Sequence, residues 1–416
     1  MITFFICLTL LVAAYFIYGR ALEKVVDIDA SAPVPSKTHY DGVDYMPLPR
    51  WRIFLIQLLN IAGTGPIFGA ILGACYGPVA FVWITLGGIL MGAMHDFVAG
   101  VISLRNEGRS LPETIGKYLG RNMYRLSMVV IPILMVLVGG VFIVTPSKIL
   151  ASMTDMPYLV WVGVVIVYYF IATILPVDKI IGKIYPVFGA ALIFMALAMF
   201  GVVVVGDYEI PELLSLSNEH INAENLPIVP TLFISIACGA ISGFHATQSP
   251  LMARCVTSEK QCRPVFFGAM IPESVIALIW AAVAMAFFGG VEGLNDFMAE
   301  NGNDAGLAVS HISLTTLGIA GSVLALLGVV AAPITSGDTA FRSARLIVAD
   351  MLKIDQKPIY KRLLVSLPLF ALGVGIAFID FDVIWRYFAW SNQTLAVFTL
   401  WMIYAWLKRR GSRYGI

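Results

Sequence analysis

The sequence predicts an all-α integral membrane protein with about eleven transmembrane helices, on the evidence of its composition and the length of its apolar runs. Of the 416 residues, 59% are hydrophobic and only 13% are charged, and the mean hydropathy is +0.86. A soluble chain of this composition would expose large apolar patches and aggregate. The apolar runs are continuous and about 20 residues long, as a membrane-spanning helix requires, rather than alternating as in a membrane β-barrel.

The distribution of positive charge predicts the orientation of these spans. The apolar segments lie at 2–19, 53–75, 79–104, 126–145, 157–175, 184–205, 229–249, 265–289, 312–336, 362–379 and 383–407. Of the 27 Lys and Arg residues, all but Lys148 and Arg386 fall on one side of these spans. Cytoplasmic loops carry the excess of Lys and Arg, so we expect an outside N-terminus, a cytoplasmic C-terminus and location in the inner (plasma) membrane. The first span lacks a basic leader and a cleavage site, so we expect it to be retained.

Charge and cysteine content limit the classes of partner and cofactor. The net charge is +1, which gives no indication of nucleic-acid binding and leaves membrane lipid as the partner that composition implies. The cysteines predict neither a disulfide framework nor a metal site, because their number is odd and their spacing is scattered; they are Cys7, Cys75, Cys238, Cys255 and Cys262. No cofactor is expected.

Loop charge and glycine content predict an inverted repeat after the first span. Spans two to six and seven to eleven form two sets of five with opposite topology, and each set has a polar segment after its second span, at 106–122 inside and 289–310 outside. The predicted divisions are an N-terminal helix with a cytoplasmic loop, a first five-helix repeat, an extracellular loop, and a second repeat with a C-terminal tail, at 1–52, 53–205, 206–228 and 229–416.

Helix-breaking residues interrupt the first span of each repeat. The stretches are "NIAGTGPIFGA" (60–70) and "GAISGFHATQSP" (239–250). Paired interruptions in matching spans indicate a transporter binding site, where an unwound backbone binds the ligand. The candidate substrate-binding residues are Gly63, Thr64, Gly65, Gly243, His245, Gln248 and Ser249. The alternative is structural: close helix packing at the glycines, a cap at Thr64, a span end at Pro250, and a His245 bonded to a neighbouring carbonyl.

Several long stretches are similar to those of one protein family. They are "HYDGVDYMPLPRWRIFLIQLLNIAGTGPIFGAILG" (39–73), "GAMHDFVAGVISLRNEGRSLPETIGKYLG" (92–120), "GFHATQSPLMARC" (243–255), "APITSGDTAFRSARLIVAD" (332–350) and "RYFAWSNQTLAVFTLW" (386–401). They resemble the carbon starvation protein A (CstA) family, and the chain resembles a short form of it. The resemblance implies the amino acid–polyamine–cation transporter superfamily, a LeuT-like five-plus-five fold, and uptake of short peptides or pyruvate during nutrient limitation.

That resemblance also suggests where a coupling ion binds. In LeuT-like folds a sodium site pairs carbonyls of the first broken helix with hydroxyls of the third helix of the second repeat. The candidates here for Na⁺ or a proton are Asn60, Thr335, Ser336, Asp338 and Thr339. The alternative is that Ser336 or Asp338 is the N-cap of a cytoplasmic helix over 339–353.

His95 and Asp96 lie inside the predicted span 79–104, and Glu273 lies inside the predicted span 265–289. Burying a charge at the membrane centre costs roughly 2.5–3.5 kcal/mol, so such residues face the protein interior and are paired. They form a proton relay or gate, or they make structural bonds to the broken helices. Neighbours on a helix point about 100° apart, so His95 and Asp96 need not touch.

The function that best fits these features is secondary active transport. We expect import of pyruvate or a related carboxylate, or of short peptides, coupled to H⁺ or Na⁺ by alternating access. A proton- or cation-conducting channel and a nutrient-sensing membrane protein are the alternatives. An enzyme is not expected, because the five histidines are dispersed and neither HExxH nor GxSxG occurs.

Overall fold

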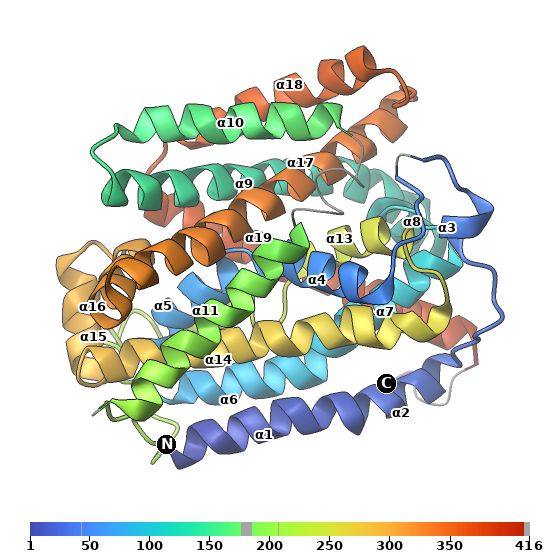
Figure 1. Cartoon of the computed structure of the whole chain (residues 1–416). Coiled ribbons are helices and arrows are strands. Elements are labelled where there is room, and N and C mark those ends of the chain that lie inside the picture. The colour runs from blue at the N-terminus through green and yellow to red at the C-terminus, as the bar shows by residue number, and fades with distance from the viewer. Residues whose placement is uncertain (43, 176–184, 207, 412–416) are drawn as a thin grey trace.

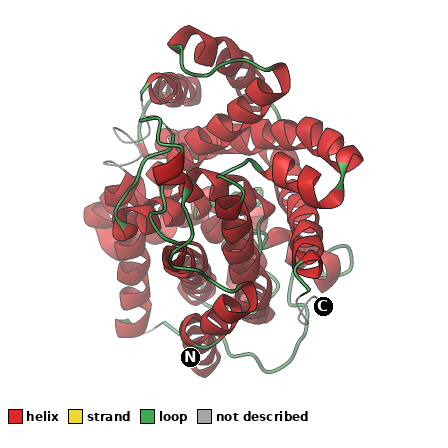
Figure 2. Ribbon diagram, turned by 90° about the vertical axis from the view of Figure 1, so that its right-hand side faces the viewer, coloured by secondary structure: helices red, strands yellow, loops and turns green. Residues whose placement is uncertain are grey.

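The computed structural model describes the chain except residues 43, 176–184, 207 and 412–416, and the described residues form helices and loops without a strand (Figures 1 and 2). The longer helices are α1 (Ile2–Phe16), α2 (Tyr18–Val26), α4 (Arg50–Ile61), α6 (Val79–Leu86), α7 (Met94–Arg105), α8 (Leu111–Leu119), α9 (Arg121–Met153), α10 (Tyr158–Ile174), α11 (Tyr185–Val205), α13 (Gly243–Ala253), α14 (Gly268–Phe287), α15 (Val291–Glu300), α16 (Ala305–Ala325), α17 (Ala331–Leu352), α18 (Ile359–Ile376) and α19 (Phe381–Arg409). The short pieces include α3 (Pro35–Thr38), η1 (Gly65–Gly69), α5 (Ala70–Ala74), η2 (Gly87–Ala93), η3 (Ile228–Leu232), α12 (Phe233–Ser235), η4 (Glu259–Gln261), η5 (Arg263–Phe267) and η6 (Leu326–Val330).

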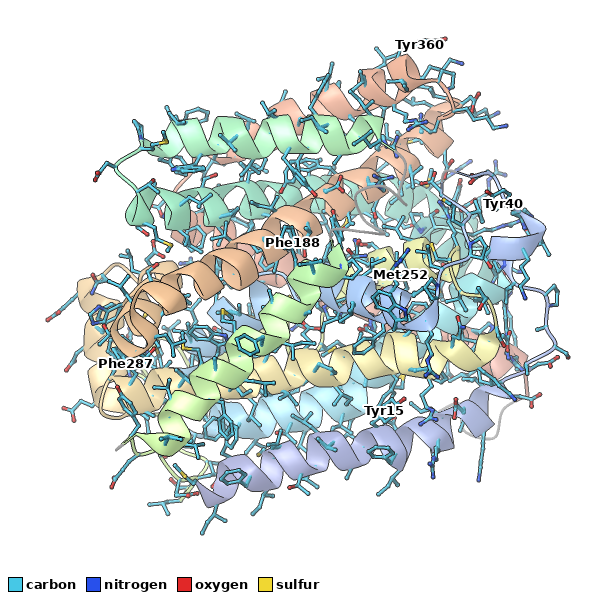
Figure 3. All side chains as sticks on the ribbon, in the orientation of Figure 1. Tyr15, Tyr40, Phe188, Met252, Phe287 and Tyr360 are labelled. Atoms are coloured by element: carbon cyan, nitrogen blue, oxygen red, sulfur yellow. The ribbon has the colours of Figure 1, made fainter. Side chains whose placement is uncertain are left out.

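Two groups of helices pack around a buried centre. In the first group, α9 packs against α10, α17 and α18; in the second, α14 packs against α4, α5, α6 and α1. Figure 1 shows α1 along one edge of the molecule and α10 with α18 along the opposite edge. The side chains of Tyr15 and Tyr360 mark these two edges in Figure 3, whereas Met252 marks α13 between them. Met252 is buried, so α13 lies where the two groups meet.

The apolar helices are those of a membrane protein, although they do not confirm a count of eleven spans. Among the described residues, six helices are long and apolar enough to cross a membrane, and a bent pair adds a seventh. The six are Ile2–Val26, Val79–Arg105, Arg121–Met153, Tyr185–Val205, Glu259–Phe287 and Ile359–Ile376. A shorter apolar helix, Tyr158–Ile174, matches another predicted span.

Both predicted interruptions are present in the backbone. Helix α4 and the segment 65–74 form the bent pair, with an angle of 54° between them. Residues 236–242 separate α12 from α13 without helical structure, and Gly239 has a φ of +89° that favours glycine. The polar segment at 106–122 contains α8, whose start has a capping box formed by Ser110 and Glu113.

The predicted ninth span, 312–336, is displaced. The structure has a kink at Gly318 inside α16 and then continues through η6 into α17, which ends at Leu352. Gly318 has a φ of +56°, so the backbone turns there without the steric cost of a side chain. The residues after 336 continue the helix because they are buried against α9 rather than exposed in a cytoplasmic segment.

Close packing at the start of α13 gives a stability prediction. A Cβ at Gly243 would overlap the backbone nitrogen of Ala396 in α19, which has no flexible side chain to move away. We therefore expect Gly243→Ala to lower the free energy of unfolding by about 1–3 kcal/mol, a typical cost of overpacking. The measurement is the thermal midpoint of purified protein in detergent.

The control is Gly163→Ala in α10, where nothing lies within 4 Å of the added Cβ. Alanine is the better helix former by roughly 0.5–1 kcal/mol, so this variant should be unchanged or slightly more stable. Equal midpoints for Gly243→Ala and wild-type protein would contradict the packing described here.

Candidate functional site

The two helix interruptions lie against each other at the centre of the protein. A Cβ at Gly65 would overlap the side chain of Cys238, and a Cβ at Gly239 would lie 3.7 Å from the Cα of Pro66. Gly63 faces the other helix group, where its Cβ would meet the ring of Phe142. Small residues are required at these points because two backbones approach each other closely.

The positions of several candidate residues differ from the prediction. His245, Gln248 and Ser249 lie in helical turns of α13, not in the unwound stretch, which ends at Ser242. Pro250 lies inside α13 rather than ending it. Because the backbone unwinds only before Gly243, the polar side chains project from an ordered helix.

The first interruption is also shorter than predicted. Asn60 lies in the last turn of α4, and the irregular residues are 62–64. Pro66 lies in the first turn of the resumed helix, as the sequence indicates. Thr64 makes no capping hydrogen bond, so the structural alternative proposed for it is wrong.

Side chains from other helices bond to the backbone groups that the interruptions expose. Ser336 in α17 donates to the carbonyl of Leu59 over 2.9 Å. Trp83 and Gln393 donate to the carbonyls of Ile236 and Phe233, at 3.1 Å and 2.9 Å. Without such partners, each buried polar group would carry a desolvation cost.

The start of α13 has a partner of its own in α19. Asn392 Oδ1 accepts from Ser242 Oγ at 3.0 Å and from the backbone N–H of Phe244 at 3.3 Å. Asn392 and Gln393 thus make interhelical hydrogen bonds, whereas Thr394 bonds to its own helix at Trp390.

A fully buried network of ionisable groups lies beside the second interruption. Asp96 Oδ1 is 2.8 Å from His95 Nδ1, and Asp96 Oδ2 is 2.9 Å from His245 Nδ1. His245 Nε2 lies 3.5 Å from Glu273 Oε1, which also accepts the N–H of Gly239 at 3.1 Å. His95 and Asp96 therefore do touch, and the three predicted intramembrane residues join α7, α13 and α14.

Polar atoms without a hydrogen-bond partner lie on α4, α13 and α19 and at the first interruption. Within the described part of the chain, they include both side-chain polar atoms of Gln57 and Asn60, Thr64 Oγ1, Gln248 Oε1 and Asn392 Nδ2. Gln57 and Asn60 are three residues apart and so share a face of α4, and α4 packs against α13. Buried polar groups are nearly always paired, so these atoms indicate a place for a polar ligand. Gln57 was not among the predicted residues, although its spacing from Asn60 is a usable signal.

The predicted coupling residues of α17 have two kinds of hydrogen-bond partner, some within their own helix and some on other helices. Thr335 and Thr339 donate to carbonyls of their own helix. Asp338 Oδ2 accepts from Tyr185 OH in α11 at 2.8 Å, a partner that the sequence did not indicate. Ser336 and Asp338 lie inside α17, whose N-cap is Val330, so the alternative of a helix start at this point is wrong.

Ion pairs close the two ends of the molecule. Lys148 Nζ lies 3.6 Å from Asp304 and 4.5 Å from the centre of the Phe381 ring, at the end formed by α15 and α16 in Figure 1. Arg342 lies 3.7 Å from Asp44, in the loop between α3 and α4. Both pairs join the helix groups to segments outside them.

All five cysteines are buried and free. Their state agrees with the prediction that they form no disulfide framework. Cys255 lies beyond the end of α13, and burial raises the pKa of its thiol to about 12, so it stays protonated at neutral pH.

Comparison with known proteins identifies the family. The model of the family described as "Carbon starvation protein CstA" matches residues 1–158 and 143–327. This chain belongs to that CstA family.

Named relatives in the family are transporters of two kinds. The chain is 26% identical over 371 residues to the pyruvate/proton symporter BtsT of Escherichia coli, covering 73% of this chain and 51% of BtsT. It is 27% identical over 334 residues to the peptide transporter CstA of Campylobacter jejuni, covering 64% of this chain and 47% of that protein. The chain therefore spans about half the length of these transporters. A membrane protein of Haemophilus influenzae is 41% identical over 348 residues, covering 71% of this chain and 94% of that protein.

Two solved structures have a fold similar to that of this chain. A crystal structure of MhsT in complex with L-phenylalanine has a TM-score of 0.60 and 13% identity, covering 86% of this chain and 88% of MhsT. A Na⁺-coupled sialic acid symporter has a TM-score of 0.54 and 14% identity, covering 95% of this chain and 85% of that one. These neighbours support the LeuT-like architecture, and at this identity they inform on fold alone.

The shared carboxylate of Asp96 gives a second stability prediction. Asp96→Ala removes the partner of two buried histidines. We expect it to lower the free energy of unfolding by about 3–5 kcal/mol, the usual cost of leaving one member of a buried charged pair without its partner. Asp96→Asn keeps one acceptor oxygen and should lose less. The measurement is thermal unfolding in detergent.

The control is Asp155→Ala, because Asp155 is exposed in a loop. This variant should unfold at the wild-type temperature. If Asp96→Ala does so as well, the network contributes nothing to stability and its description here is wrong.

Proposed function

We propose that this protein is a secondary active transporter that imports a small carboxylate such as pyruvate, or short peptides, by alternating access coupled to H⁺ or Na⁺. The observation that carries the proposal is the meeting of the two interruptions, Gly65 against Cys238, among buried polar atoms without partners. Transporter sites of this kind lie where interrupted helices face each other near the membrane centre.

The start of α13 suits the carboxylate that pyruvate and peptides share. A helix N-terminus presents N–H groups and a partial positive charge to an anion. Asn392 Oδ1 now accepts the N–H of Phe244, and a substrate oxygen in its place would make the same bond. Asn60 supplies a further donor through Nδ2, which lacks a partner, whereas the unpartnered Oε1 of Gln248 is an acceptor and its amide nitrogen donates to Thr247.

The division into two helix groups suits alternating access. Hydrogen bonds join α17 of the first group to α4 of the second and to α13 between them, from Ser336 to the carbonyl of Leu59 and from Ser343 to the carbonyl of Thr247. In the proposed cycle, one group rocks against the other, and the Lys148–Asp304 and Arg342–Asp44 pairs open in turn. The proposal includes the five-plus-five repeat, the outside N-terminus and the inner-membrane location.

Acidic residues decide how a peptide would be bound. A peptide also needs an acceptor for its amino group. Asp96 and Glu273 lie at the second interruption. Asp338 lies in α17 beside Tyr185. The peptide alternative therefore stays open alongside pyruvate, with Asp96 or Glu273 as the acceptor.

The test of transport uses purified protein in liposomes. Labelled pyruvate, a dipeptide and a tripeptide are offered with a pH gradient and a Na⁺ gradient imposed separately. We expect one substrate class to accumulate above its external concentration under one gradient. Equilibration without accumulation would favour a channel, and no uptake from folded protein would overturn the proposal.

Asp338 is the proposed coupling residue. We expect Asp338→Asn to reduce gradient-driven accumulation by about 5–150-fold, the usual range of coupling free energies, while exchange of internal for external substrate continues. Counterflow assays measure that exchange.

The matched control is Asp350→Asn on the same helix, because Asp350 is exposed. Its accumulation should equal that of the wild type. If Asp338→Asn keeps both accumulation and its dependence on the ion, Asp338 has no coupling role.

A further inference from the structure

Three buried side chains beside the second interruption have the composition of a transition-metal site. Cys238, His245 and Glu273 each offer one ligand atom, and these atoms lie within 4.8 Å of one another. They come from the segment before α13, from α13 itself and from α14, and all three residues are almost completely buried. In the described part of the chain, this is the one group of its kind.

We propose that Cys238, His245 and Glu273 bind a divalent transition-metal ion of the Zn²⁺ or Co²⁺ class. The transport proposal concerns the substrate, whereas this site concerns an ion that no relative's name mentions.

The spacing of His245 Nε2 and Glu273 Oε1 fits two ligands of one ion better than it fits a hydrogen bond. His245 Nε2 and Glu273 Oε1 are 3.5 Å apart, which exceeds ordinary hydrogen-bond lengths. Two ligands at tetrahedral angles on Zn²⁺, with metal–nitrogen and metal–oxygen distances near 2.1 Å, lie about 3.4 Å apart. His245 Nε2 is buried without a hydrogen-bond partner among the described residues, and an ion would satisfy it.

The neighbouring groups already hold the ligands in a suitable orientation. His245 directs Nδ1 to Asp96 Oδ2 at 2.9 Å, which leaves Nε2 for the metal. Metal-binding histidines almost always donate the other ring N–H to a carboxylate, a backbone carbonyl or a water. The N–H of Gly239 donates to Glu273 Oε1 at 3.1 Å and fixes that carboxylate. Asp96 is thus a positioning residue for the site.

Ligand chemistry and charge select the kind of ion. A thiolate and an imidazole favour Zn²⁺, Co²⁺ or Fe²⁺ over Mg²⁺ and Ca²⁺, which prefer oxygen ligands. One thiolate and one carboxylate neutralise a divalent ion, so the bound set carries no net charge into the interior. Three protein ligands leave a fourth position for water or for another donor.

A cavity lies beside the helix that precedes the second interruption, although none of the three proposed ligands lines it. It has a volume of about 470 Å³ and is lined by His220, Thr231, Ser235 and Arg386 among other residues. Ser235 is the last residue of α12 and precedes Cys238 by three positions.

Binding has a mechanical consequence. The ion joins the segment before α13 to α14, so it fixes the second interruption in one conformation. We expect Zn²⁺ to inhibit transport reversibly, and only this consequence rests on the proposed transport function.

The test of binding uses Co²⁺ as a spectroscopic probe. Protein is purified without a polyhistidine tag, treated with a chelator and titrated with Co²⁺. We expect one ion per chain, a thiolate-to-cobalt charge-transfer band in the near ultraviolet, visible bands of tetrahedral intensity, and loss of both on addition of Zn²⁺. Folded protein without these bands would overturn the proposal.

Variants assign the band to the proposed ligands. Cys238→Ser should abolish the charge-transfer band. A matched variant with Cys7, Cys75, Cys255 and Cys262 all changed to Ser should keep it. Asp96→Asn should weaken Co²⁺ binding by about 10–100-fold while the band keeps its position, as expected for a positioning residue. A band that survives Cys238→Ser would show that the ion binds elsewhere.

A measurement on the wild type avoids reliance on folding of the variants. X-ray absorption at the zinc edge should show one sulfur and two or more nitrogen or oxygen ligands. A first shell without sulfur would overturn the site.

Transport assays separate this proposal from the transport function. If Co²⁺ binds as described and no substrate is transported, the site stands and the transport proposal fails. If substrate is transported and saturating Zn²⁺ has no effect, the inhibitory consequence is wrong.

Discussion

The carboxylate of Asp96 is the interaction on which the centre of this protein depends. A membrane interior supplies no water, so each buried polar group must be satisfied by another part of the chain. Asp96 accepts from His95 on its own helix and from His245 on α13, and Glu273 on α14 accepts the N–H of Gly239. These bonds hold three helices around the second interruption, which would otherwise expose backbone in a dry interior.

The helical fold and the existence of both interruptions were predictable because their signals are local. Continuous apolar runs predict spanning helices, and glycine with proline predicts interruptions wherever it falls. The exact bounds of each interruption were not predictable, because they depend on contacts with residues far away in the sequence. His245 is helical because the chain resumes α13 at Gly243, as soon as Asn392 provides a partner for Ser242 and the N–H of Phe244.

Other features depended on contacts that the sequence does not show. The polar residues of 333–343 looked like a helix end, yet α9 and α11 bury them, and Tyr185 bonds to Asp338. Cysteine spacing gave no metal motif because the three proposed ligands come from three separate elements. Only the folded chain places Cys238 beside Glu273.

The unpartnered amides of α4 have a consequence for divergence within the family. Gln57 and Asn60 bond to no other described residue, so replacing either removes no existing hydrogen bond. Asp96, by contrast, accepts hydrogen bonds from two histidines, so its replacement would remove existing bonds. In the proposed transporter, ligand preference can therefore change through these amides while the scaffold is preserved.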